Sequence, residues 1–460
     1  MKILLVKPSI KMSDHIQPPL GLGYIASSIK DKHKVEILDL PRYNGALKYF
    51  DQYMTRLQPD IIGFQCYTSE VSTVRELLIM AKSKNPDFIT IAGGPHPTLL
   101  PDETLEYFGG NIDYLLRGEV EKGFKRLLDN LECQRDLSDV PGLVWNENGR
   151  INRNPPQLID DLDSIALPAW DLIRPQEYPP AQHGAFFRRF PIAPIITTRG
   201  CPFSCIFCSA PVISGKKVRT RSVDNIIKEI KLLYNEFGIR EIHIVDDNFT
   251  INKDHAKNVL NGIIRADLDI SIAFPNGVRI ESLDSELIML MKRSGVYLVS
   301  LGIESGNDEV LKSMNKQLTV GLIEEKIDII KKYDIDIAGF FVIGFSGETE
   351  DTIKRTIDFS IKLPLIRANY FEFIPLPGTE LYRSLLTKGE IREVDWARYL
   401  FITTPFVPKD MTKKTLRNLQ RLAFARFYLR PRILFKNILQ IKSLVHLKYL
   451  IKRFYHWIIM

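Results

Sequence analysis

The sequence has few cysteines, no recognisable signal peptide and no long apolar run. Five cysteines in 460 residues are too few for a disulfide framework. The N-terminus begins with a strand-like run, Met1–Val6, and has no basic region, apolar core and cleavage site of the secretory kind. No stretch reaches roughly 18 uncharged apolar residues, so no membrane-spanning helix is expected. These absences predict a cytoplasmic protein, in which clustered cysteines bind metal rather than form disulfides.

Acidic residues are absent from the C-terminal segment. Residues 411–460 contain 12 Lys and Arg and no Asp or Glu, whereas the whole chain has 62 basic and 55 acidic side chains. The other 410 residues therefore carry 50 basic against 55 acidic side chains, a net charge of −5. A body of this sign has no general affinity for nucleic acid, and an anionic partner would meet the basic tail.

The first third of the chain alternates strand and helix patterns. The alternation predicts a doubly wound parallel sheet, which binds ligands at the carboxyl ends of its strands. No G-x-G-x-x-G follows the first strand, so a dinucleotide site is not expected. A purely structural α/β domain remains the alternative. The strand patterns occupy residues 3–7, 35–40, 60–66, 88–93 and 112–116, and the helical patterns about 20–31, 70–84, 101–108 and 121–131.

Small and hydroxyl-bearing residues follow these strands. They permit close backbone approach and donate hydrogen bonds. His96 stands between two prolines, where both a ligand role and an ordinary surface position are open. The candidate contacts are Ser9, Tyr67, Thr68, Ser69, Gly93, Gly94, Pro95, His96, Gly118 and Glu119.

Three cysteines, Cys201, Cys205 and Cys208, form a C-x3-C-x2-C loop. Three thiolates leave a tetrahedral zinc site one ligand short, and no histidine stands nearby. The same set suits a [4Fe–4S] cluster in which three irons take cysteine and the fourth stays open. A partial zinc site and three reduced thiols are the alternatives.

This loop resembles that of the radical S-adenosylmethionine superfamily. The resemblance implies that the open iron is chelated by S-adenosylmethionine, which the reduced cluster cleaves to a 5′-deoxyadenosyl radical. Phe207 matches the aromatic position near the adenine. Strand patterns at 194–196, 241–246, 271–275, 296–301, 337–343 and 369–374 predict a partial β/α barrel with its function at the strands' carboxyl ends. The strand-end residues that the resemblance makes cofactor contacts are Asp246, Asp247, Arg279, Glu304, Ser305, Gly344 and Gly347.

Each of these strand-end residues alone is more often a helix cap or a solvated turn. Their ordered recurrence behind the cysteine loop is what favours a cofactor site. The expected roles are an acceptor for the methionine amino group at Asp246 and Asp247, and a partner for the carboxylate at Arg279.

The two halves together resemble cobalamin-binding radical enzymes, a class that includes C- and P-methylases, the anaerobic magnesium-protoporphyrin ester cyclase and hopanoid methylases. The resemblance implies a cobalamin-binding domain at 1–135, a linker at 136–190, the radical barrel at 191–405 and a helical extension at 406–460. The candidate contacts of the first third then become cobalamin contacts. The Asp-x-His-x-x-Gly signature is missing, since Asp14 and His15 are adjacent. Cobalamin without a protein histidine on cobalt, and a module that binds none, both remain open.

The resemblance implies C-methylation, or oxidative C–C bond formation or cyclisation, of a hydrophobic lipid- or tetrapyrrole-like substrate. An external electron donor of the flavodoxin or ferredoxin type is expected, and no nucleic acid. One alternative is an RNA-modifying, methylthiolase-like enzyme, for which only Cys66 and Cys133 could supply a second cluster. A non-enzymatic cobalamin or iron–sulfur sensor is the other.

The basic tail also carries eight aromatic side chains. Apolar residues recur at helical spacing until Pro431, and a second amphipathic stretch covers 433–459. The tail either packs its apolar faces on the barrel or makes a peripheral membrane contact at the inner face, with its cations toward anionic headgroups. The first helical pattern consists of Leu416, Leu419, Leu422, Ala423 and Phe427.

Overall fold

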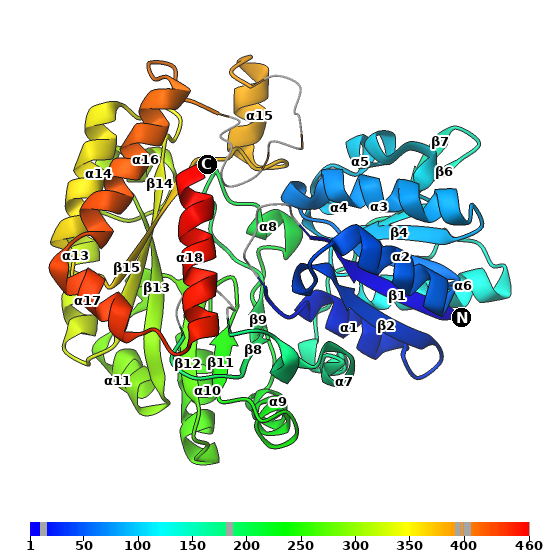
Figure 1. Cartoon of the computed structure of the whole chain (residues 1–460), viewed down its shortest axis with the longest axis horizontal. Helices are drawn as coiled ribbons and strands as arrows, with labels where there is room; N and C mark the ends of the chain where they lie inside the picture. Colours follow the sequence, from blue (N-terminus) through cyan, green and yellow to red (C-terminus); the bar gives the residue numbers. More distant parts are fainter. Residues whose placement is uncertain (10–15, 181–186, 392–395, 397–398, 400–405, 460) are drawn as a thin grey trace. The chain divides into compact units, whose positions relative to one another are not determined.

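The computed structural model describes residues 1–9, 16–180, 187–391, 396, 399 and 406–459 (Figure 1). Asp14 and His15, which break the cobalamin signature, lie outside the described residues. The chain forms two compact units. The first comprises Met1–Gln182 with two short later segments, and the second comprises most of the remainder.

The first unit is built on a seven-stranded sheet of order β2-β1-β3-β4-β5-β6-β7. Strands β1 to β5 are parallel, and β6 and β7 are antiparallel. The described strands are β1 (Lys2–Lys7), β2 (Lys34–Asp39), β3 (Ile61–Gln65), β4 (Ile89–Gly93), β5 (Tyr114–Leu116), β6 (Leu143–Glu147) and β7 (Arg150–Arg153). The described α-helices are α1 (Leu20–Ile29), α2 (Ala46–Leu57), α3 (Val71–Lys84), α4 (Pro95–Leu99), α5 (Pro101–Phe108), α6 (Glu121–Cys133) and α7 (Trp170–Ile173).

Both faces of the parallel strands are buried. Leu4 and Val6 of β1 pack in one hydrophobic cluster with side chains of α2 and α3, such as Phe50. Ile3 and Leu5, which alternate with them, pack in a second cluster with side chains of α1 and α6. Strands buried on both faces form continuous apolar runs, which is why the sequence pattern located them. The predicted doubly wound parallel sheet is confirmed.

The sequence predicts a linker at residues 136–190, but residues 143–153 within that range form two strands that extend the first sheet. Strand β6 pairs with β5, and β7 pairs with β6. The hairpin turn is Asn148-Gly149, with φ of 53° and 84°, as a two-residue turn of this kind requires. Strand β7 is a polar edge strand, and β6 has only the short apolar stretch at residues 143–145, so neither forms a long apolar run. The Asn-Gly pair is the signal that would have located them.

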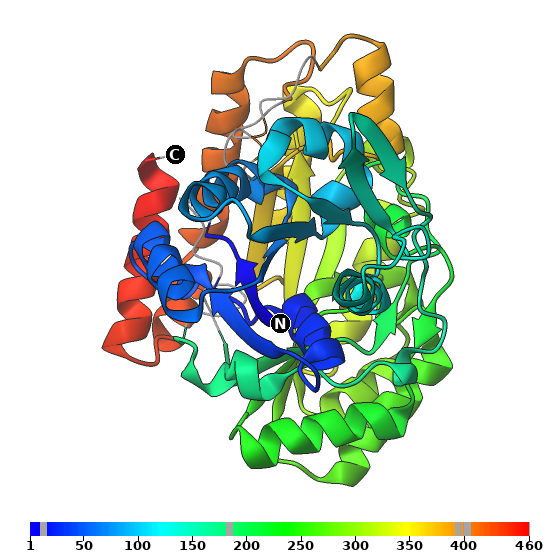
Figure 2. The same cartoon turned by 90° about the vertical axis from the view of Figure 1, so that its right-hand side faces the viewer.

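The second unit is built on a six-stranded parallel sheet of order β15-β14-β13-β12-β11-β8, and the long helices that alternate with its strands lie on the outer side of the curved sheet (Figures 1 and 2). This open sheet is the predicted partial barrel. Its described strands are β8 (Ile192–Ile195), β11 (Glu241–Ile244), β12 (Ser271–Val278), β13 (Val296–Glu304), β14 (Asp336–Ile343) and β15 (Arg367–Glu372), and β9 (Thr198–Arg199) and β10 (Arg219–Thr220) form a separate small ladder. The described α-helices are α8 (Ala210–Ile213), α9 (Val223–Glu236), α10 (Lys253–Ala266), α11 (Ser285–Arg293), α12 (Asp308–Ser313), α13 (Val320–Lys331), α14 (Glu350–Lys362) and α15 (Glu380–Thr387).

The basic C-terminal segment is helical, as predicted, and consists of α16 (Lys413–Tyr428), α17 (Pro431–Leu439) and α18 (Leu444–Ile459). Helix α16 packs against β15 and α14. Four residues of its predicted apolar face are buried, whereas Leu422 is 41% exposed. Packing on the barrel is therefore the role of α16. Among the described residues, no helix combines the length and apolarity needed to cross a membrane.

Candidate active site

The three cysteines lie on the loop that follows β9, and each thiol is partly exposed. Gly200, with φ of 97°, lets the chain turn immediately before Cys201. Burial raises the pKa of the Cys201 thiol, and it raises the pKa of Cys208 to about 11. Within the described residues, no three Cys, His, Asp or Glu side chains converge as they would around a single metal ion. These thiols become ligands only when a metal or a nearby cation stabilises the thiolates.

Arg279 supplies a cation beside this loop. Its Nη1 atom lies 3.7 Å from Sγ of Cys205, and its guanidinium carbon lies 3.5 Å from the ring centre of Phe203. Its Nη2 atom donates a hydrogen bond of 2.9 Å to the carbonyl of Lys316. The Nε atom of the same guanidinium donates a hydrogen bond of 2.5 Å to Oε1 of Glu281. Arg279, which follows β12, therefore lies against the cysteine loop, whose three thiols are the residues that would hold an iron–sulfur cluster.

Glu304 and Lys316 form a buried ion pair at the end of β13. The Nζ atom of Lys316 lies 2.6 Å from Oε1 of Glu304. Burial by itself would lower the pKa of Lys316, but the carboxylate of Glu304 and the thiol of Cys205 outweigh it and raise the pKa. Glu304 has φ of 64°, in the left-handed region. Sequence reasoning found Glu304 but missed Lys316. The turn after α12 brings Lys316 back to the end of β13, and no sequence motif marks a residue placed in this way.

The two adjacent aspartates after β11 differ in their surroundings. Asp246 is buried, and its carboxylate accepts hydrogen bonds from the backbone N–H of Thr197 at 2.6 Å and from the hydroxyl of Thr198 at 2.9 Å. Burial raises its pKa to about 6. Asp247 is exposed, and its charge contributes to the raised pKa of Cys201 and Cys208. Asp246 therefore joins β11 to the segment before the cysteine loop, and Asp247 faces that loop.

The glycine-rich segment follows β14. Gly344 has φ of 76°, and a Cβ there would lie 2.7 Å from a methyl of Leu416. Gly347 has φ of 86° and faces open space. The ring of Phe207 meets Phe345 edge to face, with centres 6.3 Å apart. The predicted adenine segment therefore contacts the cysteine loop.

Ser305 is fully buried, and its hydroxyl lies 3.0 Å from the hydroxyl of Thr356 on α14. Glu348 is also buried, and its Oε2 atom accepts a hydrogen bond of 2.9 Å from the N–H of Phe345. Burial raises the pKa of Glu348 to about 7. Both side chains hold the loops that follow β13 and β14. The sequence analysis did not single out Glu348, because a glutamate in a loop carries no sign of burial.

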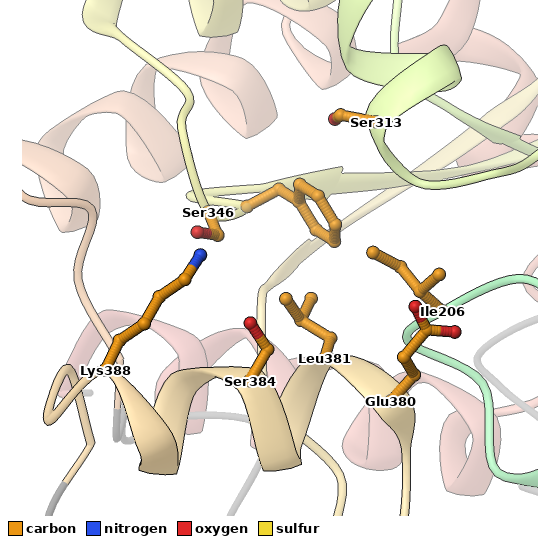
Figure 3. Close-up of a pocket in the computed structure, with 8 residues that line it drawn as sticks. Ile206, Ser313, Ser346, Glu380, Leu381, Ser384 and Lys388 are labelled. Carbon is orange, nitrogen blue, oxygen red and sulfur yellow. The ribbon is translucent and has the colours of Figure 1, made fainter.

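A pocket of about 230 Å³ lies beside the cysteine loop (Figure 3). Its apolar wall consists of Ile206, Phe345 and Leu381, and its polar wall includes two side chains of the α15 segment. In Figure 3, Lys388 extends toward Ser346. The pocket thus connects the cysteine loop to the glycine-rich segment. The complete lining is Ile206, Ser313, Phe345, Ser346, Glu380, Leu381, Ser384 and Lys388.

In the first unit, the predicted contacts gather at the carboxyl ends of the strands. Ser9 follows β1 and Tyr67 follows β3, on either side of the point where the strand order reverses. The Tyr67 side chain is 49% exposed. Gly94, with φ of 115°, approaches the next strand end so closely that a Cβ would lie 3.0 Å from the carbonyl oxygen of Cys66. An edge with glycine turns and an exposed tyrosine fits a large planar ligand such as a corrin.

Hydrogen bonds connect the loops of this edge. The hydroxyl of Thr98 donates to the carbonyl of Gly94 at 2.7 Å and accepts from the N–H of Gly118 at 2.9 Å. His96 is fully buried, with Nδ1 lying 3.2 Å from the hydroxyl of Thr68. Burial lowers the pKa of His96 to about 4, so its imidazole is neutral. The buried side chains of Thr68 and His96 therefore connect the loops after β3 and β4 within the protein, behind the exposed residues of this edge.

The remaining predicted contacts lie on the same loops. Pro95 is the first residue of α4. Ser69 is half-buried in the turn after β3. Glu119 accepts a hydrogen bond of 2.7 Å from the N–H of Ile159. Their contact with cobalamin stays a prediction.

Cys66 and Cys133 do not form a second cluster site in the described structure. Cys66 is fully buried in the cluster that packs with α2 and α3. Cys133 is exposed at the end of α6, which packs on the opposite face of the sheet. These two cysteines therefore do not supply the second cluster that an RNA methylthiolase would need.

Comparisons with known proteins agree with this geometry. The Radical SAM superfamily matches residues 195–360, and the B12 binding domain matches residues 10–128. An uncharacterized methyltransferase of Pyrococcus horikoshii is 33% identical over 98% of this chain and 97% of its own length. The anaerobic magnesium-protoporphyrin IX monomethyl ester cyclase of Rubrivivax gelatinosus is 26% identical over 90% of this chain and 74% of its own length.

The fold is that of a solved enzyme with two cofactors. The radical S-adenosylmethionine methyltransferase TsrM of Kitasatospora setae, with cobalamin and a [4Fe–4S] cluster bound, matches with a TM-score of 0.69 and 21% identity. The match covers 86% of this chain and 76% of that one. These findings confirm the predicted family, fold class and cofactors. The chain belongs to the radical S-adenosylmethionine enzymes that carry a B12-binding domain, and its cofactors are a [4Fe–4S] cluster, S-adenosylmethionine and cobalamin.

Proposed function

We propose that this enzyme methylates a carbon atom of a small hydrophobic substrate, with residues 1–135 binding cobalamin and residues 191–405 binding the cluster and S-adenosylmethionine. The observation that carries the radical step is the loop of Cys201, Cys205 and Cys208, which lies within the residues that match the Radical SAM superfamily. Methylation is favoured over cyclisation because a relative that is 33% identical over 98% of this chain is described as a methyltransferase. The cyclase relative, which is 26% identical, supports the hydrophobic character of the substrate.

The cluster and S-adenosylmethionine supply a radical that takes a hydrogen atom, and cobalamin supplies a methyl group, when all three are bound. In our proposal Cys201, Cys205 and Cys208 hold the cluster. Arg279 pairs with the cofactor carboxylate, and Asp247 accepts from its amino group. The apolar side chains of Ile206, Phe345 and Leu381, which lie beside the cysteine loop, exclude water from the reacting atoms.

The other predicted contacts with S-adenosylmethionine take supporting parts. Asp246 and Ser305 hold the loops, Glu304 orients Lys316, and Phe207 packs beside the adenine. Gly347 lets the backbone approach the adenine, because it has no side chain and faces open space, whereas Gly344 turns the chain beside it and packs against Leu416. For cobalamin we propose direct contact from Ser9, Tyr67, Ser69, Gly93, Gly94, Pro95, Gly118 and Glu119, with Thr68 and His96 acting from beneath.

Radical enzymes of this superfamily need an external electron donor. We propose a donor of the flavodoxin or ferredoxin type, because a cluster of this kind takes one electron at a time. We also propose that the enzyme works in the cytoplasm and meets the inner face of the membrane through residues 406–460. The cations of that segment are the support for this contact.

The test is turnover of anaerobically reconstituted enzyme with S-adenosylmethionine labelled in its methyl group. The substrate panel contains lipids and tetrapyrroles, and the assay follows label in the product together with 5′-deoxyadenosine. Label in a C–C bonded product supports methylation. Formation of 5′-deoxyadenosine together with an unlabelled, cyclised product would show that the enzyme catalyses cyclisation and not methylation.

The cysteine loop is tested separately. Cys201→Ala, Cys205→Ala and Cys208→Ala are each expected to abolish the electron paramagnetic resonance signal of the reduced cluster. Cys133→Ala is the matched control, because that cysteine is exposed at the end of α6. A full cluster signal in any of the three loop variants would contradict the assignment.

A further inference from the structure

The second half of the basic tail exposes large apolar side chains. Five of them form what we call the apolar ridge, on α17 and at the start of α18. The exposed fractions are 47% for Leu434, 63% for Phe435, 55% for Ile438, 65% for Leu439 and 84% for Leu444. Contiguous exposed apolar side chains are typical of surfaces that bind another body.

The ridge is rigidly presented, because the opposite face of α17 is fixed to the second unit. Ile433 is 4% exposed. The Nζ atom of Lys436 lies 2.6 Å from a carboxylate oxygen of Asp336, and Gln440 accepts a hydrogen bond of 3.2 Å from Arg367. Positions 433, 436 and 440 share one helical face, and the ridge positions 434, 435 and 438 share the other. Helix α17 is therefore amphipathic, with its polar contacts toward the rest of the second unit and its apolar face toward solvent.

Cations accompany the ridge without any acidic neighbour in the same segment. Arg432, Lys442 and Lys448 are exposed. Residues 411–460 contain no Asp or Glu. Exposed apolar side chains beside unopposed cations are the combination that anchors a helix at the surface of an anionic bilayer.

We propose that the apolar ridge, with Arg432, Lys442 and Lys448, docks the enzyme on an anionic lipid membrane. This inference names the surface for the membrane contact proposed above. A second copy of the chain is a poor occupant, because two tails of the same strong positive charge would repel each other. Nucleic acid would pair with the cations and leave the apolar side chains in water. An anionic bilayer satisfies both groups at once.

The experiment is co-sedimentation of the full chain with vesicles of phosphatidylcholine, with and without phosphatidylglycerol. We expect binding to the vesicles that contain phosphatidylglycerol, and weaker binding as salt rises. Replacing the three cations by glutamine should weaken binding by about 100-fold. The matched control replaces Lys312, Lys331 and Lys332, which are exposed elsewhere in the second unit.

The ridge itself is tested by Phe435→Ser, Ile438→Ser and Leu439→Ser in one variant. These side chains are exposed, so the variant is expected to fold with an unchanged melting temperature. Its vesicle binding should fall by at least 10-fold. The control carries serine at Leu47, Val212 and Met289, which are exposed by 43%, 49% and 40%.

Three results would overturn the proposal. In the first, the wild type fails to bind anionic vesicles at low salt. In the second, the ridge variant binds these vesicles as tightly as the wild type. In the third, the wild type sediments as a dimer and the ridge variant, unlike the cation variant, sediments as a monomer. Cleavage of S-adenosylmethionine is measured without vesicles. Its loss would refute the proposed chemistry and leave vesicle binding untouched, so the two proposals fail separately.

Discussion

The Nζ atom of Lys316 lies 2.6 Å from Oε1 of Glu304, and both side chains are nearly enclosed beside the cysteine loop. The carbonyl of Lys316 also accepts a hydrogen bond from Arg279, which contacts Cys205. The ion pair thus supports the cation that lies against the cluster ligand. It joins the ends of two barrel strands, since Arg279 follows β12 and Glu304 ends β13.

We predict that Lys316→Met destabilises the enzyme by about 3 kcal/mol, because it leaves the carboxylate of Glu304 buried without its partner. The loss of a cation near Cys205 should also make the midpoint potential of the reconstituted cluster more negative. Calorimetry and redox titration measure the two effects. Lys312→Met is the control on the exposed side of α12. If the double variant with Glu304→Gln is no more stable than Lys316→Met alone, the ion pair does not account for the loss.

A second prediction separates the two aspartates after β11. Asp246→Asn should lower the melting temperature, because the carboxylate accepts from both Thr197 and Thr198. Asp247→Asn should lower the melting temperature less than Asp246→Asn does, because Asp247 is exposed, and should weaken S-adenosylmethionine binding by about 10-fold. Equilibrium dialysis and thermal unfolding of both variants provide the measurements. The assignment fails if Asp247→Asn binds the cofactor as tightly as wild type.

The sequence predicted both sheets because strands buried on two faces form apolar runs, as Ile3–Val6 does. It missed β6 and β7, because β6 has only a short apolar stretch, β7 is a polar edge strand, and the turn between them is marked only by Asn148-Gly149. Motif spacing identified the cysteines and the neighbourhood of the other site residues. It could not assign their roles, since Asp246 and Asp247 look alike in sequence and differ only in what the fold places around them.

A third prediction concerns the proposed cobalamin edge. Gly94→Ala should destabilise the first unit, because φ is 115° and the new Cβ would lie 3.0 Å from the carbonyl oxygen and 3.3 Å from the nitrogen of Cys66. Gly45→Ala is the matched control, since Gly45 has φ of 82° but open space around it. We expect Gly94→Ala to cost about 1–3 kcal/mol more than the control. It should also weaken cobalamin binding in an optical titration, and equal effects of the two variants would contradict this role.

The last prediction follows from Glu348, whose pKa is raised to about 7 by burial, above the ordinary value of 4.5. Between these two values the folded enzyme keeps a proton that the unfolded chain has lost. The free energy of unfolding therefore falls as pH rises through this window, by up to about 3 kcal/mol for this group. Other buried acids, Asp246 among them, add to the same trend in the wild type.

Glu348→Gln isolates the contribution of this carboxyl, because glutamine can still accept from the N–H of Phe345 and cannot ionise. The melting temperature of the variant relative to wild type should therefore increase between about pH 5 and about pH 8. Glu325→Gln, at an exposed position on α13, is the control and should show no such increase. A constant difference between Glu348→Gln and wild type at both pH values would mean that Glu348 is ionised in the folded enzyme throughout. The N–H of Phe345 would then compensate its charge fully, and the loop after β14 would not become less stable as pH rises.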